Sequence, residues 1–274
     1  MVYRAQPEIS ASDALLRAIA SSQSSKGFTD LGRKIMTIDD LLDYDIDAQV
    51  ERTKNRALPR GAISLVRAWI FFGIQVVSGL YLATTTLSAM ALYASMPAWP
   101  LYIIYPTCKR WTNLAPIPLG LMFKVGIFMG WSDLSVNGSV QWDVLVPIYL
   151  GACPWTITYE TVYQHQDKID DMRIGINSPA LLCREYTISI CTATALGFLG
   201  LLLYGGSLNG QGIPFYASVA IAGILLVTAL LRTDIDKPDD CKDFFLLTPL
   251  FGQIILGGFV ADAILHRLVE GIPF

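Results

Sequence analysis

Long uncharged stretches alternate with short polar segments along most of this chain. Residues 68–108 and 186–231 carry no charged side chain, and each stretch is long enough for two membrane-crossing helices of about 20 residues. A polar, glycine-rich turn at 205–212 divides the second stretch. Further single spans are predicted over 114–131, 144–163 and 244–265. The pattern therefore predicts an all-α, multi-span transmembrane helical bundle with about seven spans.

The composition supports membrane insertion. Hydrophobic residues make up 53% of the 274 positions and charged residues only 16%, whereas soluble domains carry roughly 25% charged residues. The net charge of −3 identifies no partner: we expect no nucleic-acid partner, and no protein partner can be inferred from the sequence. The five cysteines show no metal-binding spacing, and the two histidines cannot build a metal site alone.

Residues 1–35 differ from the rest of the chain, because they contain no long apolar run. They also have too few arginines and too many acidic residues for a transit peptide. We expect a non-conforming, poorly ordered tail over residues 1–35 and one membrane domain over residues 36–274. The lack of a transit signal favours an endomembrane over the mitochondrial inner membrane.

Two dense acidic clusters lie at the ends of predicted spans, one over residues 39–47 and one over residues 167–171. Threading the spans places both clusters on the same face of the membrane, because an even number of spans separates them. Most lysines and arginines outside the spans fall on that face too, whereas Arg267 falls on the other. By the positive-inside rule this face is cytoplasmic, or faces the matrix in a mitochondrion.

The spacing of the acidic residues predicts a metal site. The first cluster has the i, i+3, i+7 spacing of one helical face, in Asp40, Asp43 and Asp47. The second has an i, i+4 pair with a further carboxylate alongside, in Asp167, Asp171 and Asp170. Carboxylates this dense beside a bilayer repel one another and cost desolvation energy, which a hard divalent cation relieves. Because Mg²⁺ is usually held by one or two carboxylates plus substrate phosphates, the two loops would suit a diphosphate ester on a lipid chain.

Four segments of the chain resemble the UbiA family of intramembrane aromatic prenyltransferases. Residues 39–47 resemble that family's first acidic motif, and residues 52–61 resemble its basic loop. The sequence Tyr-Pro-Thr-Cys-Lys-Arg at 105–110 resembles a span end of the family, and residues 159–171 resemble the second motif of its 4-hydroxybenzoate branch. The resemblance extends from about residue 37 to the C-terminus. It is strongest toward the eukaryotic 4-hydroxybenzoate enzymes and their fungal meroterpenoid relatives.

The resemblance implies an enzyme that works inside the lipid bilayer on a prenyl diphosphate and a small aromatic acceptor. The expected reaction is Mg²⁺-dependent transfer of an isoprenoid chain, farnesyl or longer, to a carbon of a phenolic aromatic acid in meroterpenoid secondary metabolism. The alternative is the 4-hydroxybenzoate polyprenyltransferase step of ubiquinone biosynthesis. An alternative of another class is a truncated, non-catalytic membrane protein.

The resemblance also implies roles for individual residues. Two Mg²⁺ ions would bridge the loops to the diphosphate, one held by Asp40, Asp43 and Asp47 and one by Asp167, Asp170 and Asp171. The expected catalytic residues among these are Asp40, Asp43, Asp167 and Asp171. The cations expected to neutralise the diphosphate oxygens are Arg56, Lys109, Arg110 and Lys168. An allylic carbocation would be stabilised by the rings of Tyr159 and Tyr163, for which an interfacial aromatic belt is the other interpretation.

The chain departs from the family pattern at several positions. Asp39 replaces the family's leading asparagine, Pro179 follows Ser178 where threonine is usual, and Lys124 stands where relatives commonly carry a neutral residue. The family has nine spans, two of them before the first motif, so we expect this chain to lack the first two family helices. That expectation favours the non-catalytic alternative, whereas the intact aspartates favour the enzyme.

Overall fold

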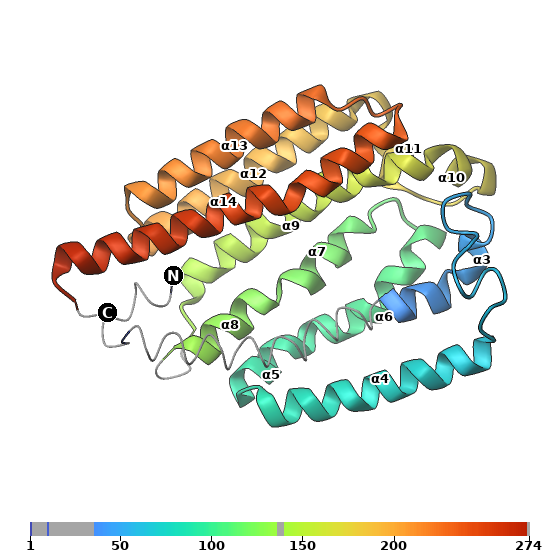
Figure 1. Ribbon diagram of the computed structural model, residues 1–274, viewed down its shortest axis with the longest axis horizontal. Coiled ribbons are helices and arrows are strands. Elements are labelled where there is room, and N and C mark those ends of the chain that lie inside the picture. Colours follow the sequence, from blue (N-terminus) through green and yellow to red (C-terminus); the bar gives the residue numbers. More distant parts are fainter. Residues whose placement is uncertain (2–9, 11–35, 136–139, 273–274) are drawn as a thin grey trace.

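The computed structural model describes residues 1, 10, 36–135 and 140–272 (Figure 1). The described parts consist of helices joined by loops and contain no strand. The poorly ordered tail predicted over residues 1–35 falls outside the described residues, apart from the isolated positions 1 and 10. The all-α prediction is confirmed for the part of the chain that the structure describes.

The helices follow one another with short connections. The first group is α3 (Tyr44–Asp47), α4 (Leu65–Thr86), α5 (Ala89–Ser95), the 3-10 helix η1 (Met96–Ala98), α6 (Trp99–Thr107), the 3-10 helix η2 (Cys108–Arg110), α7 (Pro116–Lys124) and α8 (Gly126–Leu134). The second group is α9 (Trp142–Gln164), the 3-10 helix η3 (His165–Asp167), α10 (Lys168–Ile174), α11 (Pro179–Cys183), the 3-10 helix η4 (Arg184–Tyr186), α12 (Thr187–Leu208), α13 (Ile213–Arg232) and α14 (Pro238–Glu270).

Helical structure lies at each of the predicted spans. In the described part of the chain, five helical stretches are long and apolar enough to cross a membrane: Leu65–Thr86, Pro116–Leu134, Pro179–Leu208, Ile213–Arg232 and Pro238–Glu270. The second predicted span is divided into α5, η1 and α6, because Pro97 and Pro100 each stand at the start of a new helical segment. The fourth is α9, which carries polar residues such as Glu160 among its apolar ones. The protein is thus a multi-pass, all-α membrane protein.

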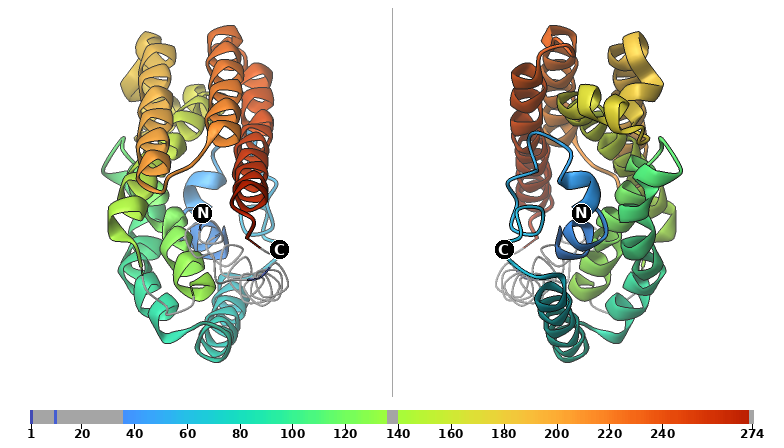
Figure 2. Two further views of the ribbon diagram at one scale, coloured as in Figure 1. Left: turned by 90° about the vertical axis from the view of Figure 1, so that its left-hand side faces the viewer. Right: turned by 90° about the vertical axis from the view of Figure 1, so that its right-hand side faces the viewer.

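Helix α9 is central to the bundle. It packs against α12, α7 and α14, while α13 packs against α14 and α12. In Figure 1, α9 runs between the early helices α4–α8 and the late helices α12–α14, and the end-on views of Figure 2 place these two groups on opposite sides. Buried apolar residues tie α9 to the late helices, as where Ile148 packs with Leu202 and Phe215.

One end of the bundle collects the polar segments. Helices α3, α10 and α11 lie together at that end (Figure 1). The loop between α13 and α14 also reaches it, because Lys168 of α10 pairs with Asp236 of that loop. Both acidic clusters therefore lie at the same end of the bundle, as the threading of the spans predicts.

Small residues allow the closest helix contacts. A Cβ built on Gly258 of α14 would lie 1.8 Å from Oγ of Ser218 and 3.1 Å from the carbonyl oxygen of Pro214, both on α13. A Cβ on the neighbouring Gly257 would meet no atom within 4 Å. Such close approach is the usual basis of helix association in membranes, where apolar burial offers little driving force.

We predict that Gly258→Val lowers the free energy of unfolding by about 1–3 kcal/mol, because the side chain cannot fit between α13 and α14. The matched variant Gly257→Val should stay within about 0.5 kcal/mol of the parent protein. Unfolding of the purified protein in detergent micelles measures both. Equal stability of the two variants would show that α13 and α14 do not pack as described.

Candidate active site

The segment that carries the first acidic cluster is helical on both sides of Asp43. Residues 36–42 form one helical stretch and α3 follows. Backbone hydrogen bonds continue across the junction, from the N–H of Asp43 to the oxygen of Asp39 (2.9 Å) and from the N–H of Asp47 to that of Asp43 (2.8 Å). Asp43 and Asp47 consequently lie on the same side of the segment, and both are buried.

Cationic side chains neutralise this first cluster. Nη1 of Arg56 lies 2.8 Å from Oδ1 of Asp40 and 2.6 Å from Oδ2 of Asp47. Nζ of Lys109, at the end of the second predicted span, lies 3.2 Å from Oδ2 of Asp43. Buried carboxylates need such partners, since an unpaired buried charge is strongly destabilising.

The second acidic cluster follows the end of α9. Arg52 donates two hydrogen bonds to Asp167, from Nε to Oδ1 (2.9 Å) and from Nη2 to Oδ2 (2.5 Å). Nη1 of Arg52 donates to Oη of Tyr163 (3.1 Å), and the backbone N–H of Glu51 donates to Oδ2 of Asp170 (2.9 Å). A bidentate arginine–carboxylate pair fixes both distance and orientation. These contacts join the two acidic loops, although 115 residues separate Arg52 from Asp167.

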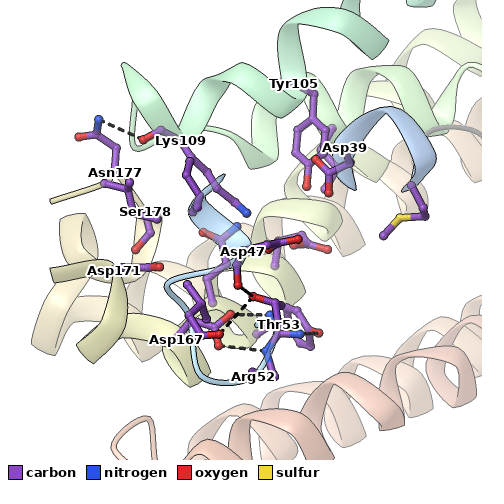
Figure 3. Close-up of a pocket in the computed structure, with 18 of the residues that line it drawn as sticks. Asp39, Asp47, Arg52, Thr53, Tyr105, Lys109, Asp167, Asp171, Asn177 and Ser178 are labelled. Atoms are coloured by element: carbon purple, nitrogen blue, oxygen red, sulfur yellow. Dashed lines mark hydrogen bonds and ion pairs between the residues drawn. The ribbon is translucent and has the colours of Figure 1, made fainter. Parts of the chain in front are cut away.

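A cavity of about 320 Å³ lies between the two loops (Figure 3). Its polar end is lined by residues of both loops and of the segment after α10, including Asp47, Arg52, Asp167, Asp171 and Ser178. Its wall continues along α7, α9 and α14 through apolar and aromatic residues, including Leu119, Phe123, Tyr159, Tyr163 and Phe245. A charged end and an apolar wall match a ligand that carries a charged head on an apolar chain.

The predicted site residues divide into two groups. Those that line the cavity are Asp47, Arg56, Lys109, Tyr159, Tyr163, Asp167 and Asp171. Asp40, Asp43 and Asp170 stand behind the lining, in contact with Arg56, Lys109 and Glu51 as described above.

Two predicted cations lie outside this lining. Arg110 bonds to Asp45 (Nη2 to Oδ1, 2.7 Å) and to the carbonyl oxygen of Leu42 (2.8 Å). Lys168 pairs with Asp236 and donates to the carbonyl oxygen of Ile235 (3.4 Å). Both cations link polar segments at this end of the bundle, and neither lines the cavity.

Several lining residues were not among the predicted site residues: Asp39, Arg52, Thr53, Tyr105, Glu160, Gln164, Asn177 and Ser178. Arg52 and Tyr105 lie within the family-like segments 52–61 and 105–110, so the resemblance to family motifs already indicated that they could belong to the site. Asn177 is positioned by a backbone contact, since its N–H donates to the carbonyl oxygen of Lys109 (2.8 Å). In Figure 3, Asn177, Ser178 and Lys109 lie along one side of the cavity.

Burial raises the pKa of the aspartates Asp39, Asp43 and Asp171 at this site. It raises the pKa of Asp39 to about 7 and that of Asp171 to about 6. Neighbouring carboxylates add to both shifts, and Lys109 opposes them. Burial also raises the pKa of Asp43, against the opposing effect of Lys109. A cationic ligand would favour the ionised forms, so cation binding and proton release are coupled here.

The donor chemistry of the site fits a hard divalent cation. In the described residues, the cavity lining has five carboxyl side chains (Asp39, Asp47, Glu160, Asp167, Asp171) against three cations (Arg52, Arg56, Lys109). No hydrogen bond reaches Oδ1 of Asp43 from any described residue, although that atom is buried. Oxygen donors and an excess of negative charge are what Mg²⁺ requires. No group of three or more acidic, histidine or cysteine side chains is close enough in the described chain to hold a metal without further ligands. A substrate diphosphate would supply such ligands.

Comparison with known proteins decides the family. The profile of the UbiA prenyltransferase family matches residues 34–255. The chain belongs to the UbiA prenyltransferase family.

The relatives of this UbiA-family chain include named enzymes. It is 38% identical over 230 residues to the mitochondrial 4-hydroxybenzoate polyprenyltransferase of Drosophila melanogaster, covering 84% of this chain and 58% of the relative. It is 36% identical over 225 residues to the Homo sapiens protein of that name, covering 82% and 60%. It is 35% identical over 224 residues to 4-hydroxybenzoate geranyltransferase 2 of Lithospermum erythrorhizon, covering 82% and 72%. The chain thus spans only about half to three fifths of the length of the polyprenyltransferases.

Solved structures support the fold. The apo structure of a UbiA homologue from Aeropyrum pernix K1 superposes with a TM-score of 0.74 at 23% identity, covering 91% of this chain and 93% of that one. A structure of digeranylgeranylglyceryl phosphate synthase superposes with a TM-score of 0.66 at 19% identity, covering 91% and 86%. The UbiA type of helical bundle, predicted from the motifs, is therefore confirmed.

A buried histidine beside the second motif gives a testable pH dependence. Burial, with a smaller contribution from Lys168, lowers the pKa of His165 from 6.5 to about 4. Its Nε2 lies 2.8 Å from Oγ1 of Thr187. Because the folded state favours the neutral ring, this histidine binds fewer protons when folded than when unfolded. Its contribution to stability is therefore complete above about pH 6.5 and is lost as the pH falls toward 4.

We predict that His165→Gln, which can keep a hydrogen bond to Thr187, removes this acid-dependent loss. The raised pKa values of Asp39 and Asp171 act in the opposite direction in an overlapping range, so the readout is the difference between variant and parent. Unfolding transitions in micelles between pH 4 and 7 measure it. His266→Gln is the control. Parallel stability profiles for parent and His165→Gln would contradict the prediction.

Proposed function

We propose that this protein transfers an isoprenoid chain from its diphosphate to a ring carbon of 4-hydroxybenzoate or a similar phenolic acid, with Mg²⁺ as cofactor. One observation carries the proposal: the two acidic loops meet at the charged end of a single cavity, held there by Arg52 and Asp167. The apolar wall below suits the isoprenoid chain, and the charged end suits its diphosphate.

The names of the relatives support the choice of acceptor. Those compared are called 4-hydroxybenzoate polyprenyltransferase or 4-hydroxybenzoate geranyltransferase. They favour the 4-hydroxybenzoate reaction of ubiquinone-type biosynthesis over the meroterpenoid pathway that we first expected. Several are mitochondrial by name, so they lend no support to the endomembrane location expected from residues 1–35.

The protein's own residues would act on the donor. When bound, Mg²⁺ would act as a Lewis acid on the diphosphate, held by the aspartates of the two loops with Asp47, Asp167 and Asp171 nearest the cavity. Arg56 and Lys109 would place positive charge where the leaving diphosphate gains negative charge. Asp40, Asp43 and Asp170 lie outside the cavity lining. They would contribute through their contacts with Arg56, Lys109 and Glu51.

The apolar wall would protect the reactive carbon. Tyr159, Tyr163 and Phe245 pack together, with ring centroids 5.8 Å apart for Tyr159 and Phe245 and 4.5 Å apart for Tyr163 and Phe245. Aromatic faces stabilise a cation, and an apolar enclosure keeps water from capturing it.

We also propose that residues 36–274 form the prenyltransferase domain as one unit.

We predict that Asp167→Asn reduces Mg²⁺-dependent transfer at least about a hundredfold, because it removes a carboxylate charge from the cavity and one half of the pair with Arg52. Membranes containing the protein would be supplied with farnesyl diphosphate and 4-hydroxybenzoate, with and without Mg²⁺. The matched control is Asp239→Asn, an exposed aspartate in the first turn of α14, which should leave the rate unchanged.

Two results would contradict the proposed function. One is full activity of the Asp167→Asn variant while it inserts normally into membranes. The other is the absence of prenylated product from the parent chain with farnesyl or longer donors, which would favour the non-catalytic alternative.

A further inference from the structure

One acidic side chain of the cavity belongs to neither acidic loop. Glu160 lies inside α9, within the fourth predicted span, and lines the cavity beside Tyr159 and Tyr163. A carboxylate inside a membrane helix is costly to bury and is usually kept for a function. The roles proposed above for the acidic loops give Glu160 none.

The surroundings of Glu160 leave its carboxylate available. Gln164, one turn later on α9, lines the same cavity. Lys109 and Lys124 act on Glu160 electrostatically, yet neither forms an ion pair with it among the described residues. Lys124 instead lies over the ring of Tyr159, with Nζ 6.0 Å from the centroid. Glu160 is thus an acceptor with remaining capacity, held on the cavity wall.

The position of Glu160 along α9 suits an aromatic acceptor. It precedes Asp167 by seven residues, which corresponds to a rise of about 10 Å along a helix. A single aromatic ring fits within that length, between the diphosphate end and the carboxylate. The tyrosine hydroxyls nearby are less suited to accept a proton, since a neutral phenol is a much weaker base than a carboxylate, and Oη of Tyr163 already accepts a hydrogen bond from Arg52.

We propose that the carboxylate of Glu160 binds the phenolic hydroxyl of the aromatic acceptor and takes its proton as the new carbon–carbon bond forms. This proposal rests on the proposed function, because it assigns the acceptor side of that same cavity. Glu160 would be a catalytic residue for the phenol, distinct from the aspartates that face the diphosphate.

The proton and electron changes balance. The bond between the allylic carbon and the diphosphate oxygen breaks, and its electron pair leaves with the diphosphate. The ring carbon beside the phenolic carbon forms the new bond to the allylic carbon, while the phenolic proton moves to Glu160. The resulting cyclohexadienone regains its aromatic ring when that ring carbon loses its proton to the released diphosphate and Glu160 returns its proton to the oxygen. Ionisation of the phenol as it attacks makes the ring a stronger nucleophile.

The first test measures binding rather than turnover. Calorimetry on the purified protein, with Mg²⁺ and unreactive farnesyl thiodiphosphate, compares 4-hydroxybenzoate with 4-methoxybenzoate, which lacks the hydroxyl hydrogen. The parent protein should bind the hydroxy compound about tenfold to a hundredfold more tightly, as a hydrogen bond to a charged group provides. Glu160→Gln should lose most of this preference, and the exposed control Glu185→Gln should keep it.

The second test measures transfer to 4-hydroxybenzoate from farnesyl diphosphate. Glu160→Gln should lower kcat about a hundredfold or more with little change in the KM for the donor. Glu160→Asp, which keeps the carboxylate on a shorter side chain, should recover part of the loss. Glu185→Gln should transfer at the parent rate.

A purely structural role for Glu160 predicts a different result. If Glu160 served only to neutralise Lys124, the double variant Glu160→Gln, Lys124→Met would restore both the hydroxyl preference and the rate, and that rescue would overturn the proposal. A parent protein without hydroxyl preference, or a Glu160→Gln variant that keeps it, would also overturn it. The proposed function is tested separately, by transfer activity. A parent protein that prefers the hydroxy compound but forms no prenylated product would support the binding role of Glu160. The same result would contradict the proposed prenyltransferase activity.

Discussion

The ion pair between Arg52 and Asp167 connects the two halves of the site. Each acidic loop alone is a dense group of like charges at the end of an apolar bundle, and the two loops would repel each other on approach. The guanidinium of Arg52 holds Asp167 through two hydrogen bonds and Tyr163 through a third, while the backbone of Glu51 holds Asp170. These contacts offset that repulsion and hold the two loops together at the charged end of the cavity.

The same arrangement explains how a charged site can sit beside a bilayer. Arg56 and Lys109 pair with the first cluster, and the pKa values of Asp39 and Asp171 rise, so the net charge buried at the site is smaller than its number of carboxyl groups suggests. Cations and protons that stabilise the ligand-free site are also the groups that a metal–diphosphate ligand would displace or reorganise. Stability and ligand binding are therefore coupled through one set of side chains.

Much of the architecture could be predicted from the sequence for a simple reason. Uncharged stretches of membrane-crossing length mark the spans, and their number fixes which loops share a face. The spacing of aspartates marked the two acidic loops, and the structure brings those loops together. What sequence could not give was the partner of each cation. Arg110 pairs with Asp45, 65 residues away, and Lys168 with Asp236, 68 residues away, because tertiary packing decides which side chains meet.

Glu160 is a further residue whose place in the site could not be predicted from the sequence. Although Glu160 lies within the family-like segment 159–171, its spacing from Asp167 does not separate its role from those of the aspartates, and only the packing of α7, α9 and α14 around a cavity gives it a place. Arg52 is similar, since its neighbours in the basic loop, Lys54 and Arg56, look equivalent in sequence but pair with Glu51 and with the first acidic cluster instead.

We propose that the two acidic loops together would hold metal ions around one diphosphate. Electron paramagnetic resonance with Mn²⁺ in place of Mg²⁺ can detect such ions, because Mn²⁺ is a similar hard cation with a spectroscopic signal. With farnesyl thiodiphosphate present, we expect protein-bound Mn²⁺ whose spectrum is broadened by a second ion nearby, and we expect either Asp47→Asn or Asp171→Asn to remove that broadening. Absence of bound Mn²⁺ in the parent protein, or magnetically isolated ions unaffected by these variants, would contradict this proposal.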